Sequence, residues 1–245
     1  MRYGILSDIH GNLEALDAVL DRLSTAGVSS YLCLGDVVGY GADPNACCER
    51  VRALPGLCVV GNHDLAAIGA FDLRWFNAYA CAAAEWTERE LRPENRSFLA
   101  ALPEVAWGVG FQLVHGSPIK PTTGYVTDAF EATAALEAQK EPLCFVGHTH
   151  VPMAFSCRQG GLLCAAVPFR VGQAVLMEAG YQYLVNCGGV GQPRDGNPRA
   201  ACGVYDTDAG TVELLRVSYD IAAAQAKMRA AGLPPILADR LAFGR

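Results

Sequence analysis

The chain has 245 residues, of which 51% are hydrophobic, so it is long enough to bury a substantial core. Its formal net charge of −6 and its pI near 5.4 argue against sequence-independent binding of nucleic acid, because no broad positive field attracts a phosphate backbone. No apolar run approaches the roughly 20 residues that cross a bilayer, and Asp8 and His10 come too early for a signal peptide.

Alternating strand and helix patterns fill the first part of the chain and predict parallel strand pairing. The apolar run at residues 3–6 predicts a strand, and leucines at three-to-four spacing predict a helix that Asn12 caps and Gly27 ends. The elements expected next are a buried strand within residues 29–36, a helix that starts at Pro44, and a third strand within residues 56–64.

The middle of the chain continues this alternation. Between residues 72 and 102 the Ala-rich composition predicts one or two helices that cover the sheet. The elements that follow are a single strand that begins near residue 107 and ends on His115, a helix over residues 128–140, and a strand from residue 142 that ends in His148 and His150. Each histidine motif therefore stands at the end of an expected strand.

Beyond residue 151 the pattern changes to short strands separated by Gly and polar turns. The expected strands lie within residues 153–159, 161–167, 173–179 and 181–187, and a hairpin turns around residues 208–210. Residues 220–232 predict a closing helix. Because no linker, repeat or low-complexity tract interrupts the sequence, we expect one domain over residues 1–245 with a two-sheet core.

The ten cysteines predict buried free thiols rather than disulfide bonds. Many lie inside apolar runs, where cysteine behaves as a small hydrophobic residue, and no C-x-x-C spacing occurs. This usage is typical of a reducing compartment, so we expect a cytoplasmic protein.

The chain contains five histidines, and every one follows an apolar run at an expected strand end. A single histidine is usually structural, but this shared placement indicates a common site. On an extended segment, residues two apart point to the same side, so Asp8 and His10 are expected to converge on one ion. His148 and His150 repeat that spacing, whereas the adjacent Asn62 and His63 are expected to diverge.

Strand ends of a mostly parallel sheet meet at one edge, where open α/β folds bind ligands. The donors that this edge gathers are Asp8, His10, Asp36, Asn62, His115, His148 and His150. They are too many for one four-coordinate ion, and they suit two ions that share a bridging carboxylate. Nitrogen and oxygen donors without thiolate favour Mn, Fe, Zn, Co or Ni over Ca or Mg, and we expect two divalent transition-metal ions, with Mn first among them.

The motifs DIH, GDVVGYG, GNHD, VHGSP and GHTH occur in this order. With them the chain resembles the calcineurin-like metallophosphoesterases, and more narrowly their small bacterial phosphodiesterase branch. The resemblance spans residues 2–216. It implies an α/β fold in four layers, a sandwich of two mixed sheets flanked by helices, with the metals at one edge.

The resemblance also implies a role for each donor. The first ion would be held by Asp8, His10 and His150, the second by Asn62, His115 and His148, and Asp36 would bridge them. His63 would donate a hydrogen bond or a proton to the leaving oxygen, and Asp64 would orient its ring. The implied reaction is in-line attack on phosphorus by a hydroxide that bridges the two metals.

Two departures from the family pattern narrow the expected substrates. Relatives that act on phosphoproteins or dinucleoside polyphosphates usually carry Asp-Arg where this chain has Gly39 and Tyr40. Both activities are therefore disfavoured for this chain. In the segment NCGGVGQPRDG, Cys187 and Gly189 replace the family's Pro and Ser. Arg194 in this segment is expected to reach a substrate phosphate, with a solvated or structural arginine as the alternative.

The leading hypothesis is a phosphodiesterase for small, nucleotide-like or cyclic diesters. The nearest alternative is a nucleotide phosphomonoesterase, and the alternative of another class is a non-catalytic metal-binding scaffold. A nuclease is disfavoured because the acidic chain offers no evident strand-binding surface. We expect a small phosphate-ester substrate and no membrane partner, and the oligomeric state stays open.

Overall fold

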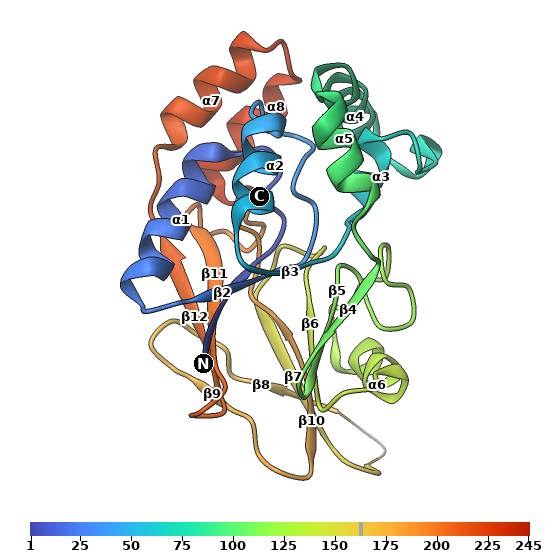
Figure 1. Cartoon of the computed structure of the whole chain (residues 1–245), viewed down its shortest axis with the longest axis vertical. Coiled ribbons are helices and arrows are strands. Elements are labelled where there is room, and N and C mark those ends of the chain that lie inside the picture. The colour runs from blue at the N-terminus through green and yellow to red at the C-terminus, as the bar shows by residue number, and fades with distance from the viewer. Residues whose placement is uncertain (162–163) are drawn as a thin grey trace.

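The computed structural model describes residues 1–161 and 164–245, and two mixed six-stranded sheets form its centre (Figure 1). The first sheet has the order β3-β2-β1-β11-β12-β9, with the strands Gly56–Cys58, Ser30–Cys33, Arg2–Leu6, Ala200–Asp206, Thr211–Val217 and Val175–Leu176. The second has the order β4-β5-β6-β10-β7-β8, with the strands Val105–Gly108, Phe111–Val114, Leu143–Val146, Tyr181–Asn186, Met153–Arg158 and Ala165–Val167. The parallel pairings join β1, β2 and β3 in the first sheet and β5, β6 and β10 in the second, so β10 from the later part of the chain is also parallel.

Helices cover the outer faces of both sheets. The α-helices are α1 (Leu13–Thr25), α2 (Pro44–Ala53), α3 (Asn62–Ala67), α4 (Ala78–Glu90), α5 (Pro93–Ala100), α6 (Ala129–Ala138), α7 (Ile221–Ala230) and α8 (Pro235–Asp239), and the 3₁₀ turns are η1 (Leu73–Trp75) and η2 (Arg240–Phe243). Apolar residues of α1 pack against β11 and β12, and those of α6 pack against β10 and β7. The expected four-layer α/β sandwich of two mixed sheets is confirmed.

The core between the sheets joins apolar side chains from both of them. Phe111 lies at its centre, with its ring edge-on to Phe145 at 6.1 Å and to Tyr205 at 5.8 Å between centroids. Edge-to-face aromatic pairs at such distances add to the free energy gained from burial. This core fixes the two sheets against each other, and with them the strand ends that carry the site.

Replacing Phe111 with Ala is expected to lower the free energy of unfolding by about 3–5 kcal/mol, because a fully buried ring is lost and a cavity stays behind. Urea denaturation followed by circular dichroism measures the change, with an unchanged m-value. Phe130→Ala is the matched control, since this ring on α6 is 85% exposed and its loss is expected to change stability by no more than about 0.5 kcal/mol. Equal effects of the two substitutions would contradict this account of the core.

Most expected elements are confirmed, and three need correction. The strand expected to run unbroken to His115 is a hairpin of β4 and β5, because Gly110, at φ +78°, makes a turn between them. The motif GNHD does not end a strand but starts helix α3. Helix α8 and turn η2 were not expected, since their short segment lacks a helical apolar period. Residues 162 and 163 of the expected strand over 161–167 lie outside the described residues, and β8 follows them.

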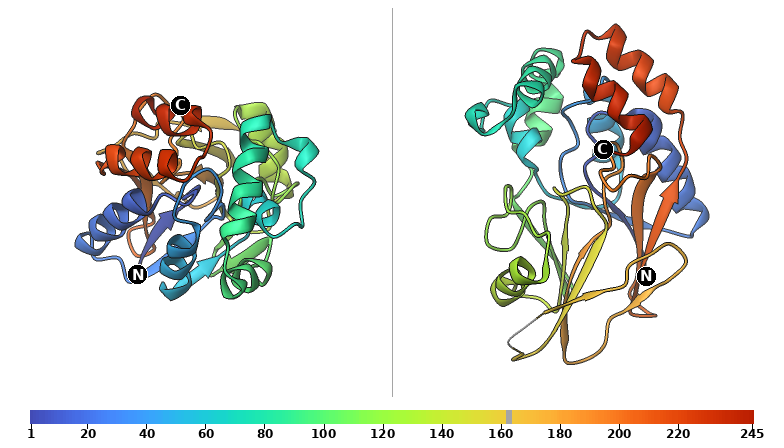
Figure 2. Two further views of the ribbon diagram at one scale, coloured as in Figure 1. Left: turned by 90° about the horizontal axis from the view of Figure 1, so that it is seen from above. Right: turned by 180° about the vertical axis from the view of Figure 1, so that it is seen from behind.

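Two groups of helices lie at one end of the molecule, α3 to α5 in one and α7 with α8 in the other (Figure 2). They meet through an apolar cluster that contains Tyr40, Ala83 of α4 and Met228 of α7. Apart from Cys157, the cysteines are free thiols, as expected. In the part of the chain that the structure describes, no helix has the length and hydropathy of a membrane span.

Candidate metal centre

The candidate site lies where the parallel strands of both sheets end. Asp8 and His10 follow β1, Asp36 follows β2, and His115 follows β5 of the second sheet. The ligand atoms within each of two buried triads lie within 4.8 Å of one another, and the triads are Asp8, His10, His150 and Asp36, His115, His148. The sequence interpretation placed these donors at the edge of one mostly parallel sheet, and the structure corrects this, because the strand ends of two sheets contribute.

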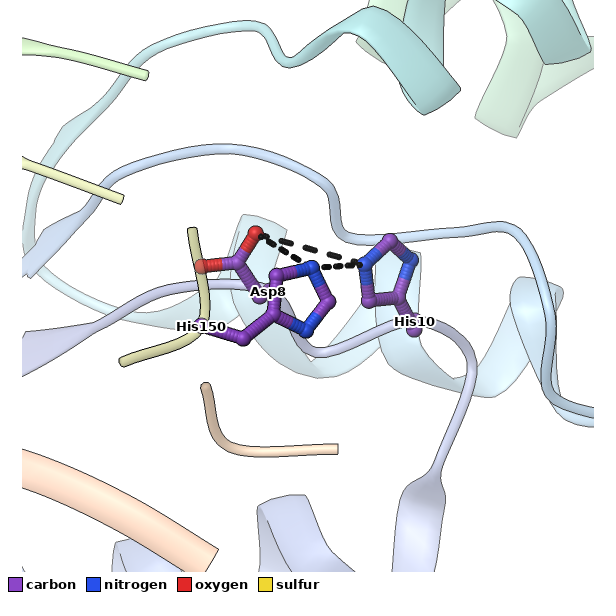
Figure 3. Close-up of side chains that lie close together, drawn as sticks. All are labelled: Asp8, His10 and His150. Carbon is purple, nitrogen blue, oxygen red and sulfur yellow. Dashed lines mark hydrogen bonds and ion pairs between the residues drawn. The ribbon is translucent and has the colours of Figure 1, made fainter. Parts of the chain in front are cut away.

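In the first triad, the atoms that face one another are His10 Nε2, His150 Nε2 and Asp8 Oδ1 (Figure 3). His10 Nδ1 faces the Val38 carbonyl at 3.1 Å, and His150 Nδ1 faces the Gln192 carbonyl at 2.5 Å. A carbonyl only accepts, so each Nδ1 carries the proton and each Nε2 presents a lone pair. These Nε2 atoms are 3.2 Å apart, and His150 Nε2 is 3.3 Å from Asp8 Oδ1, which has no hydrogen-bond partner. Such an arrangement repels itself unless a cation sits between the atoms.

In the second triad, donor atoms converge in the same way around His115. Its Nδ1 faces the Leu34 carbonyl at 2.8 Å, and its Nε2 lies 3.1 Å from both Asn62 Oδ1 and His148 Nδ1. Asp36 Oδ2 is a further 3.3 Å neighbour of that Nε2. A proton on His115 satisfies one of these acceptors, whereas a divalent cation coordinates all of them.

Asp36 belongs to the second triad and also faces the first. Its Oδ2 is 3.3 Å from His115 Nε2 and 3.6 Å from His10 Nε2, and it has no hydrogen-bond partner. Its Oδ1 accepts a 2.8 Å bond from the backbone N–H of His63. The carboxylate is therefore held by one oxygen, and the other is free to be shared between two cations. The residues present fit a pair of divalent metal ions.

Burial and neighbouring charges set the protonation of these groups. Burial raises the pKa of Asp8 to about 6, and it lowers the pKa of His148 to about 3. Burial also lowers the pKa of His115, but the Asp36 carboxylate outweighs it and raises the value to about 9. The field of Asp36 thus favours positive charge at the centre, and the neutral imidazole of His148 is the form that binds metal.

Backbone strain is concentrated in this site. Among the described residues, the non-glycine residues with positive φ are Asp8, His10, Asp36, Tyr40, His148 and His150, at +51° to +65°. Left-handed conformations cost about 1–2 kcal/mol each for such residues, and they persist where the surroundings enforce them. The extended segment expected at Asp8 and His10 is therefore wrong, since both residues are left-handed and converge through a tight turn.

Two glycines make room for Asp36 and His63. A Cβ on Gly61 would lie 2.0 Å from Asp36 Oδ1, and one on Gly39 would lie 2.8 Å from His63 Nδ1. Gly39 also has φ +91°, which side chains rarely adopt. The glycine that replaces the family's Asp at this position thus matches the local space.

His63 is enclosed by aromatic rings. Its ring centroid lies 4.4 Å from that of Tyr40 and 4.5 Å from that of Phe76, which stacks on it at 27°. Burial lowers the pKa of His63 to about 4, so its ring is neutral at pH 7. The expected contact with Asp64 is absent, because both Asp64 oxygens accept backbone N–H groups, those of Val38 and Gly61. Asp64 fixes the two loops, and stacking orients His63.

A cavity of about 580 Å³ opens over the two triads, and Arg194 lines it. Its guanidinium lies 5.8 Å from the Tyr40 ring centroid and donates to Gln192 Oε1 at 2.8 Å. Lys120 and several aromatic residues also line this cavity, and the sequence interpretation missed them. They stand on loops without a periodic pattern, so no local signal marks them.

A two-sheet α/β sandwich with imidazole and carboxylate groups gathered at its strand ends defines a metallophosphoesterase. The calcineurin-like phosphoesterase superfamily domain matches residues 1–210, and the chain belongs to this superfamily. It is 39% identical to protein MJ0912 of Methanocaldococcus jannaschii, over 98% of this chain and 97% of that protein.

Solved structures of other proteins have the same fold as this chain. A metallophosphoesterase from Sphaerobacter thermophilus is 43% identical, with a TM-score of 0.87 over 100% of this chain and 99% of that one. The hypothetical protein PH1004 from Pyrococcus horikoshii OT3 is 19% identical, with a TM-score of 0.80 over 100% of this chain and 98% of that one, and it shares the fold. The superfamily membership that the motifs predicted is confirmed.

Proposed function

We propose that this protein is a phosphodiesterase with two divalent metal ions, manganese first among them, and that it hydrolyses small, nucleotide-like or cyclic phosphodiesters. The observation that carries the proposal is the shared Asp36 carboxylate, whose free Oδ2 faces a histidine of each triad. A single ion does not use that many convergent donors. Two cations bound there would acidify a water and neutralise the charge that builds on the phosphate during in-line attack.

The chain's own residues supply the rest of the reaction. Asp8, His10 and His150 hold one ion, Asn62, His115 and His148 hold the other, and Asp36 is shared. His63 is not among the ligands and lines the cavity, where its ring N–H is placed to donate to the leaving oxygen. Arg194 binds the phosphate through its guanidinium, pre-positioned by Gln192.

The cavity favours small esters over polymers. Its volume of about 580 Å³ suits a ligand of nucleotide size, since small-molecule sites span about 300–1,000 Å³. The net charge of −6 disfavours a long nucleic-acid strand. These features support the small phosphodiesterase branch of the family.

The test is an assay of the purified protein, loaded with Mn²⁺, Ni²⁺ or Co²⁺, on bis(p-nitrophenyl) phosphate and p-nitrophenyl phosphate side by side. We expect metal-dependent hydrolysis that EDTA abolishes, with the larger kcat/KM for the diester. Faster monoester hydrolysis would favour the phosphomonoesterase. Inactivity on both esters with tight metal binding would favour the scaffold.

A further inference from the structure

One wall of the cavity is aromatic, and of its rings only that of Phe76, which stacks on His63, serves the groups described above. Phe71, Trp75 and Phe76 follow helix α3 and line this wall. Phe71 and Phe76 pack together with ring centroids 5.3 Å apart, and Phe76 stacks on His63. The Trp75 side chain lies at the rim and is 82% exposed. A contiguous apolar patch exposed beside a cavity often marks a ligand surface, and Trp75 extends the patch that Phe71 and Phe76 begin.

The Trp75 ring is presented on an ordered turn. The 3₁₀ turn η1 is capped by Asp72, whose Oδ1 accepts the Arg74 N–H at 3.0 Å. Phe76 N–H closes the turn on the Leu73 carbonyl at 2.9 Å, and the Cys81 thiol donates to the same carbonyl at 3.2 Å. Because the backbone is fixed before binding, little conformational entropy is lost when a ring stacks on this indole.

Polar groups complete the cavity around the aromatic wall. Lys120 and Arg194 supply positive charge, and Asn77 and Thr123 line it as well. Cations suit the phosphate, the amide and the hydroxyl suit sugar or base edges, and flat aromatic surfaces suit a base. This combination matches a nucleoside joined to a phosphate better than it matches an alkyl ester.

We propose that the second substituent of the phosphodiester is a nucleoside, and that its base stacks on Trp75, which makes Trp75 a specificity-determining residue. The inference rests on the proposed function and narrows its substrate class. Stacking of a base on an aromatic side chain is worth roughly 5- to 100-fold in binding. The preference for a nucleoside over an alkyl group is expected within that range, at about 10-fold or more.

Two diesters with the same leaving group test this preference. The p-nitrophenyl ester of thymidine 5′-phosphate carries a base, and methyl p-nitrophenyl phosphate carries none. The Mn²⁺-loaded wild type is expected to hydrolyse the nucleoside ester with at least a 10-fold larger kcat/KM, because the chemistry at phosphorus and the leaving group are the same.

Variants assign the preference to the indole. Trp75→Ala is expected to raise KM for the nucleoside ester about 10-fold with little change in kcat, since stacking holds the ground and transition states alike. The methyl ester is expected to be unaffected, and Trp75→Phe to restore most of the preference. Trp107→Ala is the matched control, because this indole on β4 is 53% exposed and does not line the cavity.

Binding measured without turnover separates the two proposals. Calorimetry with thymidine 5′-monophosphate and methyl phosphate on the Mn²⁺-loaded protein is expected to show the same Trp75-dependent preference. If neither ester is hydrolysed but this preference appears, the proposed function fails and the base-binding wall stands. If both esters are hydrolysed at equal kcat/KM and Trp75→Ala changes neither, the function stands and the inference is overturned. Equal binding of the two ligands also overturns it.

Discussion

Asp36→Asn is expected to lower kcat/KM for bis(p-nitrophenyl) phosphate by about 10³-fold or more. The substitution keeps the shape of the side chain, and its carbonyl oxygen can still accept the His63 N–H that Oδ1 accepts at 2.8 Å. It removes the negative charge at the atom that lies between the two triads. Metal ions contribute several kcal/mol to such a reaction, and each 1.36 kcal/mol is tenfold in rate.

Metal binding gives the same variant a readout that does not depend on activity. A ligand that binds only the folded chain raises its melting temperature, so Mn²⁺ is expected to raise that of the wild type, and metal content is expected to approach two ions per chain. Asp36→Asn is expected to lose most of this shift and at least one ion. Asp21→Asn, on the exposed face of α1, is the control and is expected to behave as wild type. Full metal content together with full activity in Asp36→Asn would contradict the shared-carboxylate account.

Most candidate donors could be read from the sequence because they stand just after an apolar strand, and Asn62, which starts helix α3, is the exception. His115 and His148 illustrate this, since each follows a strand with four buried residues, and parallel strands direct their ends to one region. The position of each of these residues at the end of a strand was therefore enough to identify it as a candidate donor. No detailed knowledge of the loops was needed to list these residues.

The way in which the donors converge could not be read in the same manner. Asp8 and His10 meet through two left-handed residues, a conformation that no local propensity favours and that the surrounding backbone bonds impose. The Asp8 N–H donates to the Gly35 carbonyl and the His10 N–H to the Asp36 carbonyl, so a distant loop sets this turn. Tertiary contacts therefore determine the conformation of Asp8 and His10, which the sequence pattern predicted to be extended.

The lining of the cavity could not be predicted from the sequence for a related reason. Trp75 and Lys120 belong to loops far apart in the sequence, and only the fold brings them to one cavity. The role expected for Asp64 failed because its position next to His63 suggests contact, whereas the first turn of α3 directs its oxygens to backbone N–H groups. Adjacent side chains in the first turn of a helix point in different directions, so Asp64 does not contact the ring of His63.

His63→Asn is expected to lower kcat for phosphodiesters by about 10²- to 10⁴-fold while metal binding is retained. The His63 ring is not among the converging donors, and this residue contacts the centre through its backbone N–H on Asp36 Oδ1 and through an edge-on ring contact with His10 at 4.9 Å between centroids. Asparagine keeps that backbone bond. The Mn²⁺-dependent rise in melting temperature is therefore expected to match that of the wild type, and KM is expected to change little.

The five histidines all lie in the site, so no histidine elsewhere in the chain serves as a matched control, and a pair of substrates takes that place. A proton donor matters most when the leaving oxygen is strongly basic. His63→Asn is therefore expected to lose more activity on a phenyl ester than on the corresponding p-nitrophenyl ester, whose leaving group needs less help. An equal loss on both esters, or a lost metal-dependent melting shift, would show that His63 supports the structure of the cavity and does not deliver the proton.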